Sequence, residues 1–187
     1  MKQPIMQCML LFLGIFLITA CTRQASVKTV EPNAAAFINP ANKSKVTGLL
    51  SFRQTDNGVR ISGTITGLTP GVHGIHIHEY GTCNADASAA GGHFNPNKSQ
   101  HGSPASKSRH AGDLGNITAN QKGVASVNTI GKHISLGGNN NVIGRAIVIH
   151  ERADDYITQP SGNSGKPIGC GTIGIAKQRE QSNAKAK

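Results

Sequence analysis

Residues 71–83 read GVHGIHIHEYGTC, which places three of the chain's eight histidines within six positions. In a β-strand alternate side chains point to the same face, so His76 and His78 lie together. Ile75 and Ile77 share the opposite face, which suits an apolar core. Neutral imidazoles are good ligands for copper or zinc, and this spacing suits one ion. The segment therefore predicts a strand with a core face and a metal-binding face.

His73 lies three positions before His76 and so falls on the isoleucine face of the same predicted strand. Its favoured role is a hydrogen bond inside the fold, with metal binding as the alternative.

Alternating apolar and polar residues recur along the rest of the chain. In GVRISGTITG (58–67), Val59, Ile61 and Ile65 have one parity and the polar side chains have the other, which is typical of a half-buried strand. Turn sequences such as TDNG, LTPG and NQKG separate similar runs. The chain has 23 glycines and no sustained helical periodicity, so we expect an all-β sandwich or barrel. Further strands are predicted around 45–54, 73–80, 125–130, 145–150 and 172–176.

Residues 81–112 interrupt the strand pattern with a long stretch of low apolar content. A loop of about thirty residues inside a compact domain is usually functional. The loop contains His93, His101 and His110, and Asp113 follows it directly. Three imidazole nitrogens and one carboxylate oxygen can complete a four-coordinate zinc site. We therefore expect a metal ion, rather than an apolar core, to order this loop.

Residues 1–20 read as a secretory signal peptide, because the apolar run from Cys8 to Ile18 is too short to span a bilayer. Residues 17–21, LITAC, resemble the lipobox of bacterial lipoproteins, in which the cysteine is lipidated. Cys21 is therefore the predicted membrane anchor; a cleaved signal with Cys21 as a free thiol is the alternative. Residues 21–33 are interpreted as a lipidated tether, 34–176 as the folded domain and 177–187 as a basic disordered tail.

The formal net charge is +10 at pH 7. An exported chain without tryptophan or a cluster of arginines is a poor candidate for nucleic-acid binding. Attraction to an anionic envelope surface or to a small anionic substrate fits the charge better. Cys83 and Cys170 are the cysteines left in the body of the chain, and in an oxidising compartment they predict one disulfide.

Five sequence blocks occur in order across residues 34–176: GVHGIHIHEYGTC, GGHFNP, RHAGDLGN, GRAIVIHERADD and GNSG....CGTIGIA. The ordered set resembles the copper/zinc superoxide dismutase family. The resemblance implies an eight-stranded Greek-key β-barrel with long metal-binding loops, an architecture already established for that family. It also implies copper and zinc as cofactors and superoxide as the substrate, which is dismuted to oxygen and hydrogen peroxide.

The resemblance carries specific roles to residues of this chain. The implied copper ligands are His76, His78, His93 and His150. The implied zinc ligands are His93, His101, His110 and Asp113. His93 is thus expected to bridge both ions and to act in catalysis by taking up and returning a proton. Asp154 is expected to link one ligand histidine of each site, and Cys83 and Cys170 match the family disulfide.

The sequence departs from the family at an arginine that stands beside the copper in the pattern G-N-x-G-x-R-x-x-C-G. Here the segment reads GNSGKPIGCG (162–171), so Pro167 occupies the arginine position. Lys166 is adjacent, but neighbouring side chains of an extended segment point apart, and Arg145 is expected to face away from His150. Loss of charged hydrogen bonds worth about 1.5 to 3 kcal/mol would slow catalysis by roughly tenfold to a hundredfold.

Two functions are therefore compatible with the sequence. The first is a dismutase of reduced rate, and the second is a non-catalytic copper/zinc-binding protein of the envelope. Both are expected to be exported and lipid-anchored, facing outside the cytoplasm. The sequence marks no surface for self-association, and His133 matches no ligand block.

Overall fold

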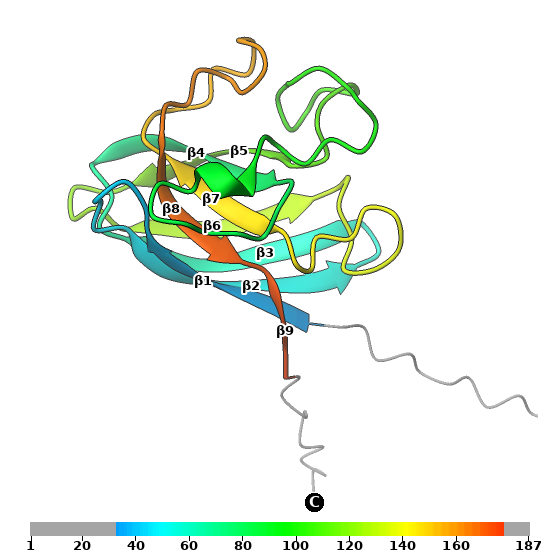
Figure 1. Cartoon of the computed structure of the whole chain (residues 1–187), viewed down its shortest axis with the longest axis horizontal. Coiled ribbons are helices and arrows are strands. Elements are labelled where there is room, and N and C mark those ends of the chain that lie inside the picture. The colour runs from blue at the N-terminus through cyan, green and yellow to red at the C-terminus, as the bar shows by residue number, and fades with distance from the viewer. Residues whose placement is uncertain (1–32, 178–187) are drawn as a thin grey trace, which may run out of the picture. The chain divides into compact units, whose positions relative to one another are not determined.

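The computed structural model describes residues 33–177. The predicted signal peptide, Cys21 and residues 178–187 of the predicted tail lie outside this range. The described chain is built from β-strands and one short 3-10 turn, Ser88–Ala90 (Figure 1). The strands are β1 (Asn33–Pro40), β2 (Thr47–Thr55), β3 (Gly58–Thr66), β4 (Gly71–His78), β5 (Asp113–Ala119), β6 (Ala125–Gly131), β7 (Ala146–His150), β8 (Pro167–Thr172) and β9 (Gly174–Ala176).

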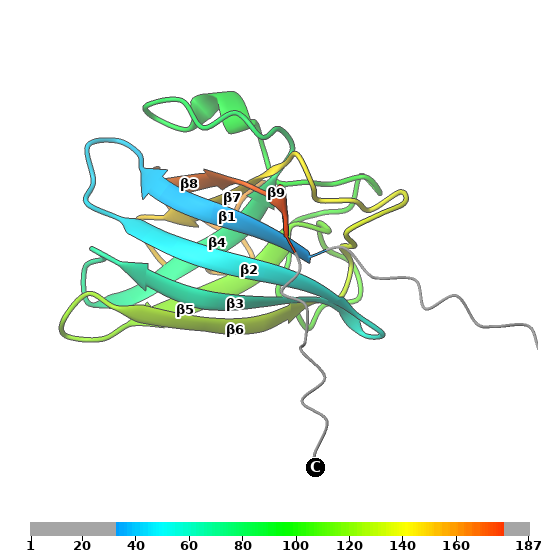
Figure 2. The same ribbon diagram turned by 90° about the horizontal axis from the view of Figure 1, so that it is seen from below.

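Eight of the strands form one antiparallel sheet in the order β5-β4-β7-β8-β1-β2-β3-β6, and β9 pairs with β1. The two ends of this order, β5 and β6, lie close to each other, so the sheet curls into a nearly closed barrel (Figure 2). Consecutive strands β3 and β4 are not paired, because β3 pairs with β6 while β4 pairs with β5 and β7. The connections therefore cross the ends of the barrel, and the predicted all-β, eight-stranded Greek-key fold is confirmed.

The barrel interior follows from the alternating pattern of the strands. Val59, Ile61 and Ile65 of β3 are fully buried, while the residues between them face outward or are half-buried. In β4, Ile75 and Ile77 join the same core. The opposite face of β4 is buried as well, because the long loop covers it. This strand therefore differs from the half-buried strands, whose outer face is in solvent.

The structure corrects several strand predictions. The run predicted at 172–176 is instead two strands, β8 and β9, separated at Ile173, whose backbone bonds to Gly144 and Arg145. β1 and β5 were not predicted as strands. β1 carries three successive alanines with no apolar–polar alternation, and β5 contains Gly115 and Asn116, residues that disfavour strands. Both are formed because neighbouring strands supply their hydrogen-bond partners.

The predicted disulfide is present. Cys83, in the loop after β4, is bonded to Cys170 of β8 with an S–S distance of 2.05 Å. The bond joins the start of the long loop to the barrel wall across 87 residues. Among residues 33–177, the structure contains no helix of the length and apolar character needed to cross a bilayer.

Candidate metal centre

The barrel strands and the long loop bring seven predicted ligands into two adjoining clusters. His76 and His78 come from β4, and His150 is the last residue of β7, the strand paired with β4. The loop between β4 and β5 contributes His93, His101 and His110, and Asp113 is the first residue of β5. All seven are buried, with exposed fractions of 9% or less.

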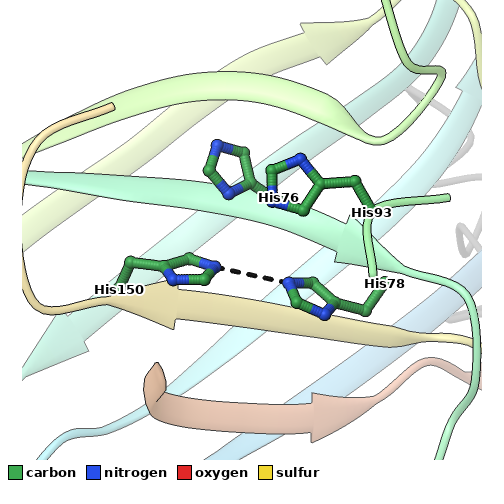
Figure 3. Close-up of side chains that lie close together, drawn as sticks. All are labelled: His76, His78, His93 and His150. Atoms are coloured by element: carbon green, nitrogen blue, oxygen red, sulfur yellow. Dashed lines mark hydrogen bonds between the residues drawn. The ribbon is translucent and has the colours of Figure 1, made fainter. Parts of the chain in front are cut away.

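The first cluster is made of four imidazoles whose candidate ligand atoms all lie within 4.8 Å of one another: His76, His78, His93 and His150. Figure 3 shows the four rings converging from β4, β7 and the long loop. Four neutral nitrogens in one buried group match the ligand type that copper prefers.

Backbone carbonyls fix which nitrogen of two of these rings is free. His78 Nδ1 lies 2.7 Å from the carbonyl oxygen of Gly91, and His150 Nδ1 lies 3.0 Å from that of Gly165. A carbonyl can only accept, so both Nδ1 atoms donate and both Nε2 atoms carry lone pairs. These two Nε2 atoms face each other at 3.3 Å (Figure 3, dashed line). In the neutral rings neither can donate to the other, so a cation between them is the partner that satisfies both.

The second cluster contains three imidazoles and one carboxylate: His93, His101, His110 and Asp113. Asp113 Oδ1 lies 2.8 Å from His93 Nδ1, 3.0 Å from His101 Nδ1 and 3.2 Å from His110 Nδ1. The buried Nδ1 atoms of His101 and His110 have no hydrogen-bond partner among the described residues. Three nitrogens and one oxygen aimed at one point fit a closed four-coordinate zinc site.

His93 belongs to both clusters. Its Nδ1 contacts Asp113, while its Nε2 is buried without a partner among the described residues. A buried ring nitrogen without a partner is costly. The geometry therefore suits an imidazole that contacts a metal through each nitrogen.

Asp154 links the two clusters by contacting one histidine ring of each. Its Oδ2 lies 2.9 Å from His76 Nε2, and its Oδ1 lies 2.9 Å from His101 Nε2. Gly162, at φ 67°, passes so close that a Cβ atom there would collide with this carboxylate. Asn116 holds the backbone of Asp154 by two hydrogen bonds, an interaction that the sequence alone did not reveal. Both rings are thus turned so that Nδ1 is left for a metal.

Burial lowers the pKa values of two ligand histidines, while neighbouring carboxylates raise that of a third. Burial lowers the pKa of His78 to about 4 and that of His93 to about 3, which keeps both rings neutral at pH 7. Burial also opposes protonation of His101, but the carboxylates of Asp113 and Asp154 outweigh it and raise its pKa to about 9. Burial opposes ionisation of both carboxyls, yet their histidine neighbours hold each pKa well below its usual range.

Two further histidines lie outside the clusters. His73 is buried, and its Nδ1 and Nε2 lie 2.9 Å from the carbonyl oxygens of His150 and Thr69. It therefore has the expected role of a hydrogen-bonding core histidine. His133 belongs to neither cluster.

The first cluster opens into a cavity of about 630 Å³. His78, His93 and His150 line it, together with Pro167 and Lys166. Lys166 and Pro167 both line this cavity, and Lys166 Nζ lies 3.4 Å from Glu151 Oε1. Arg145 lies elsewhere, as expected: it bonds Glu79 at 2.8 Å and stacks 3.7 Å from the centre of the Phe94 ring.

The fold and the site define a class of protein: an antiparallel β-barrel metalloprotein with two histidine-rich clusters joined by one residue. The sequence model of the family described as copper/zinc superoxide dismutase (SODC) matches residues 46–173. The chain therefore belongs to the copper/zinc superoxide dismutase family, and its cofactors are copper and zinc.

Named relatives agree with this family. Superoxide dismutase [Cu-Zn] 5 of Dictyostelium discoideum is 44% identical over 140 residues, covering 71% of this chain and 92% of that protein. The extracellular superoxide dismutase [Cu-Zn] of Haemonchus contortus is 39% identical over 176 residues, covering 89% of this chain and 96% of that protein. A crystal structure of the clock protein EA4 is similar with a TM-score of 0.73 and 37% identity, covering 79% of this chain and 97% of that one.

The pKa pattern predicts acid sensitivity of the metal-free protein. Histidines have an ordinary pKa of about 6.5, so below that pH these side chains are protonated in the unfolded chain. In the folded protein His78 and His93 become protonated only near pH 4 and pH 3. Stability should therefore fall as the pH falls from about 6.5, and the two carboxyls act in the same direction below about 4. The raised pKa of His101 acts the other way, but most of its contribution is already present at pH 7 and changes little below 6.5. Urea unfolding of EDTA-treated protein should show a loss of about 2 kcal/mol or more between pH 7 and 4. A stability that stays constant or rises over that range would contradict the prediction.

Proposed function

We propose that this protein dismutes superoxide to oxygen and hydrogen peroxide. The observation that carries the proposal is the pair of clusters that share His93, one of four imidazoles and one of three imidazoles with a carboxylate. Their donor sets differ in the way that a copper ion and a zinc ion require. We assign copper to His76, His78, His93 and His150, and zinc to His93, His101, His110 and Asp113.

Copper held by the four imidazoles would supply the one-electron redox chemistry that dismutation of superoxide needs. Zinc held by the second cluster would supply no redox chemistry and would fix the loop and the shared imidazole. His93 is the catalytic residue of the chain itself. Its buried Nε2 takes up a proton in one half of the cycle and returns it in the other, while Nδ1 remains on the zinc side.

Asp154 and the disulfide act as positioning elements in this proposal. Asp154 accepts from one ring of each cluster, which fixes the orientation of both rings before a metal arrives. Cys83–Cys170 ties the start of the long loop to β8. The disulfide thereby holds the loop, which forms part of the cavity wall, against β8, the strand that begins at Pro167.

From the family pattern we take Pro167 to stand where an arginine normally meets the substrate. Pro167 lines the cavity, but its ring offers neither charge nor a hydrogen-bond donor. We therefore expect turnover to be slower, by roughly tenfold to a hundredfold, than with a guanidinium at this position.

The same departure supports a second candidate function, a copper- and zinc-binding protein without turnover. Both candidates need the complete ligand set, so only a dismutation assay separates them. Stopped-flow measurement on the copper- and zinc-loaded protein should show catalysis under the first proposal and none under the second.

We also propose that the protein is exported and anchored to a membrane by lipid on Cys21. The disulfide and the extracellular relative from Haemonchus contortus support secretion. The anchor itself rests on the LITAC sequence at residues 17–21.

The metal assignment can be tested by substitution. Metal analysis after dialysis should find about one copper and one zinc per chain. His110→Ala should remove zinc while the four-imidazole cluster still holds copper. His93→Ala should change the optical spectrum of bound copper, because it takes a ligand from both ions. Retention of both metals with an unchanged copper spectrum would disprove the bridging assignment.

Cys21→Ser tests the anchor. The variant should lose labelling by a radioactive fatty acid and move from the membrane fraction to the soluble fraction, because the lipid is the proposed attachment. Cys83→Ser, which leaves the lipobox intact, is the control and should stay in the membrane fraction. Membrane association of Cys21→Ser at the wild-type level would refute the lipid anchor.

Pro167→Arg tests the departure from the family. The substitution should raise kcat/KM by roughly tenfold or more, because it restores a charged donor at the cavity wall. Steering of superoxide by positive charge is already established for superoxide dismutases. The gain should decrease with salt, since charges beyond about 10 Å are largely screened at 0.1 M ionic strength. If the fully loaded wild type is inactive and Pro167→Arg creates no activity, the dismutase proposal is excluded.

A further inference from the structure

The cavity in front of the copper cluster contains very little charge. Among its described lining residues, Lys166 is the one lysine or arginine and Asp86 is the one acid. Much of the remaining wall is formed by small or apolar residues such as Ala87, Gly92 and Pro160. A small anion that enters this cavity therefore meets one permanently cationic side chain.

The backbone holds Lys166 next to a copper ligand. The carbonyl of Gly165 accepts the hydrogen bond from His150 Nδ1 at 3.0 Å. The N–H of Glu151, which follows His150, donates to the carbonyl of Lys166 at 3.0 Å. Pro167 restricts the preceding residue to extended conformations. The main chain of Lys166 is thus fixed relative to the cluster, while its side chain is about half exposed.

The Pro167 side of this segment is also held. Asn42, in the turn between β1 and β2, donates from Nδ2 to the carbonyl of Pro167 at 2.8 Å and to that of Asp86 at 3.0 Å. Asn42 therefore joins Asp86 and the residue that follows Lys166 to one turn of the barrel.

The ammonium group of Lys166 has a nearby acid partner. Lys166 Nζ lies 3.4 Å from Glu151 Oε1, and the two side chains are 54% and 43% exposed. Exposed ion pairs of this kind are weak. The lysine can therefore leave Glu151 and turn toward an anion in the cavity at little cost.

We infer that Lys166 orients the anionic substrate at the copper cluster and that Glu151 limits how far its charge acts in the cavity. This inference rests on the proposed dismutase function. Lys166 provides a mobile point charge and not the planar fork of an arginine. It therefore supports binding and steering of the anion with less directional control, which agrees with the slower turnover expected for Pro167.

Azide binding to the copper- and zinc-loaded protein tests this role without turnover. Azide is a small anion, and its dissociation constant can be measured by optical titration of the copper band. Lys166→Ala should raise that constant about fivefold, because a positive charge is removed from the cavity wall, and should lower kcat/KM for superoxide by a similar factor. Lys166→Arg should keep most of the azide affinity, since it preserves the charge.

Lys122→Ala is the matched control, because it removes the same charge from the exposed turn between β5 and β6, outside the cavity lining. It should change the azide constant by less than about twofold. Glu151→Gln should tighten azide binding by about twofold to fivefold, because it frees Lys166 and removes a negative charge. Weaker azide binding in Glu151→Gln would contradict the part assigned to Glu151.

The outcomes separate this inference from the function on which it rests. Equal azide constants for Lys166→Ala and Lys122→Ala, in a protein that turns over superoxide, would overturn the role of Lys166 alone. The expected azide pattern in a protein without turnover would support Lys166 as an anion-binding residue and exclude the dismutase proposal.

Discussion

The structure depends on a cluster of buried imidazoles whose ring nitrogens have a complete set of partners only when metal ions are bound. Burial keeps rings such as His78 and His93 neutral, with pKa values of about 4 and 3. Each neutral ring has a nitrogen with a lone pair. Among the described residues, several of these nitrogens face another lone pair or have no hydrogen-bond partner. In most protein cores that arrangement would be strongly unfavourable. Here the same feature creates two sites in which copper and zinc replace the missing hydrogen-bond donors.

The barrel provides the rigidity that this crowding needs. Paired strands β4 and β7 carry three of the four copper-cluster histidines, so the fixed spacing of a sheet sets their separation. The long loop is attached to that sheet by its disulfide, by Asp113 at the start of β5, and by the hydrogen bonds of Asp154. The disulfide and the Asp154–His101 contact join chain segments that are distant in sequence. Loop order and metal binding therefore support each other.

The cavity decides what the metal centre can do. His78, His93 and His150 line the cavity, and Pro167 and Lys166 are part of its wall. A lysine attracts an anion without fixing its orientation as a guanidinium would. The chain thus combines two complete ligand clusters with a single lysine in the lining of the cavity.

The sequence by itself indicated the all-β class, because strand periodicity is a local property, and its resemblance to a family supplied the full set of candidate ligands. Three patterns could be identified from the sequence: the shared parity of His76 and His78, the alternation around Ile61 and the histidines of residues 81–112. Tertiary structure alone decided that β1 and β5 are strands, since their hydrogen bonds come from distant partners. It also decided which ring nitrogen is free, because the carbonyls of Gly91 and Gly165 have no sequence signature. It also placed Lys166 near the copper cluster, because the N–H of Glu151, next to His150, donates to the carbonyl of Lys166, a contact between segments that no local pattern pairs.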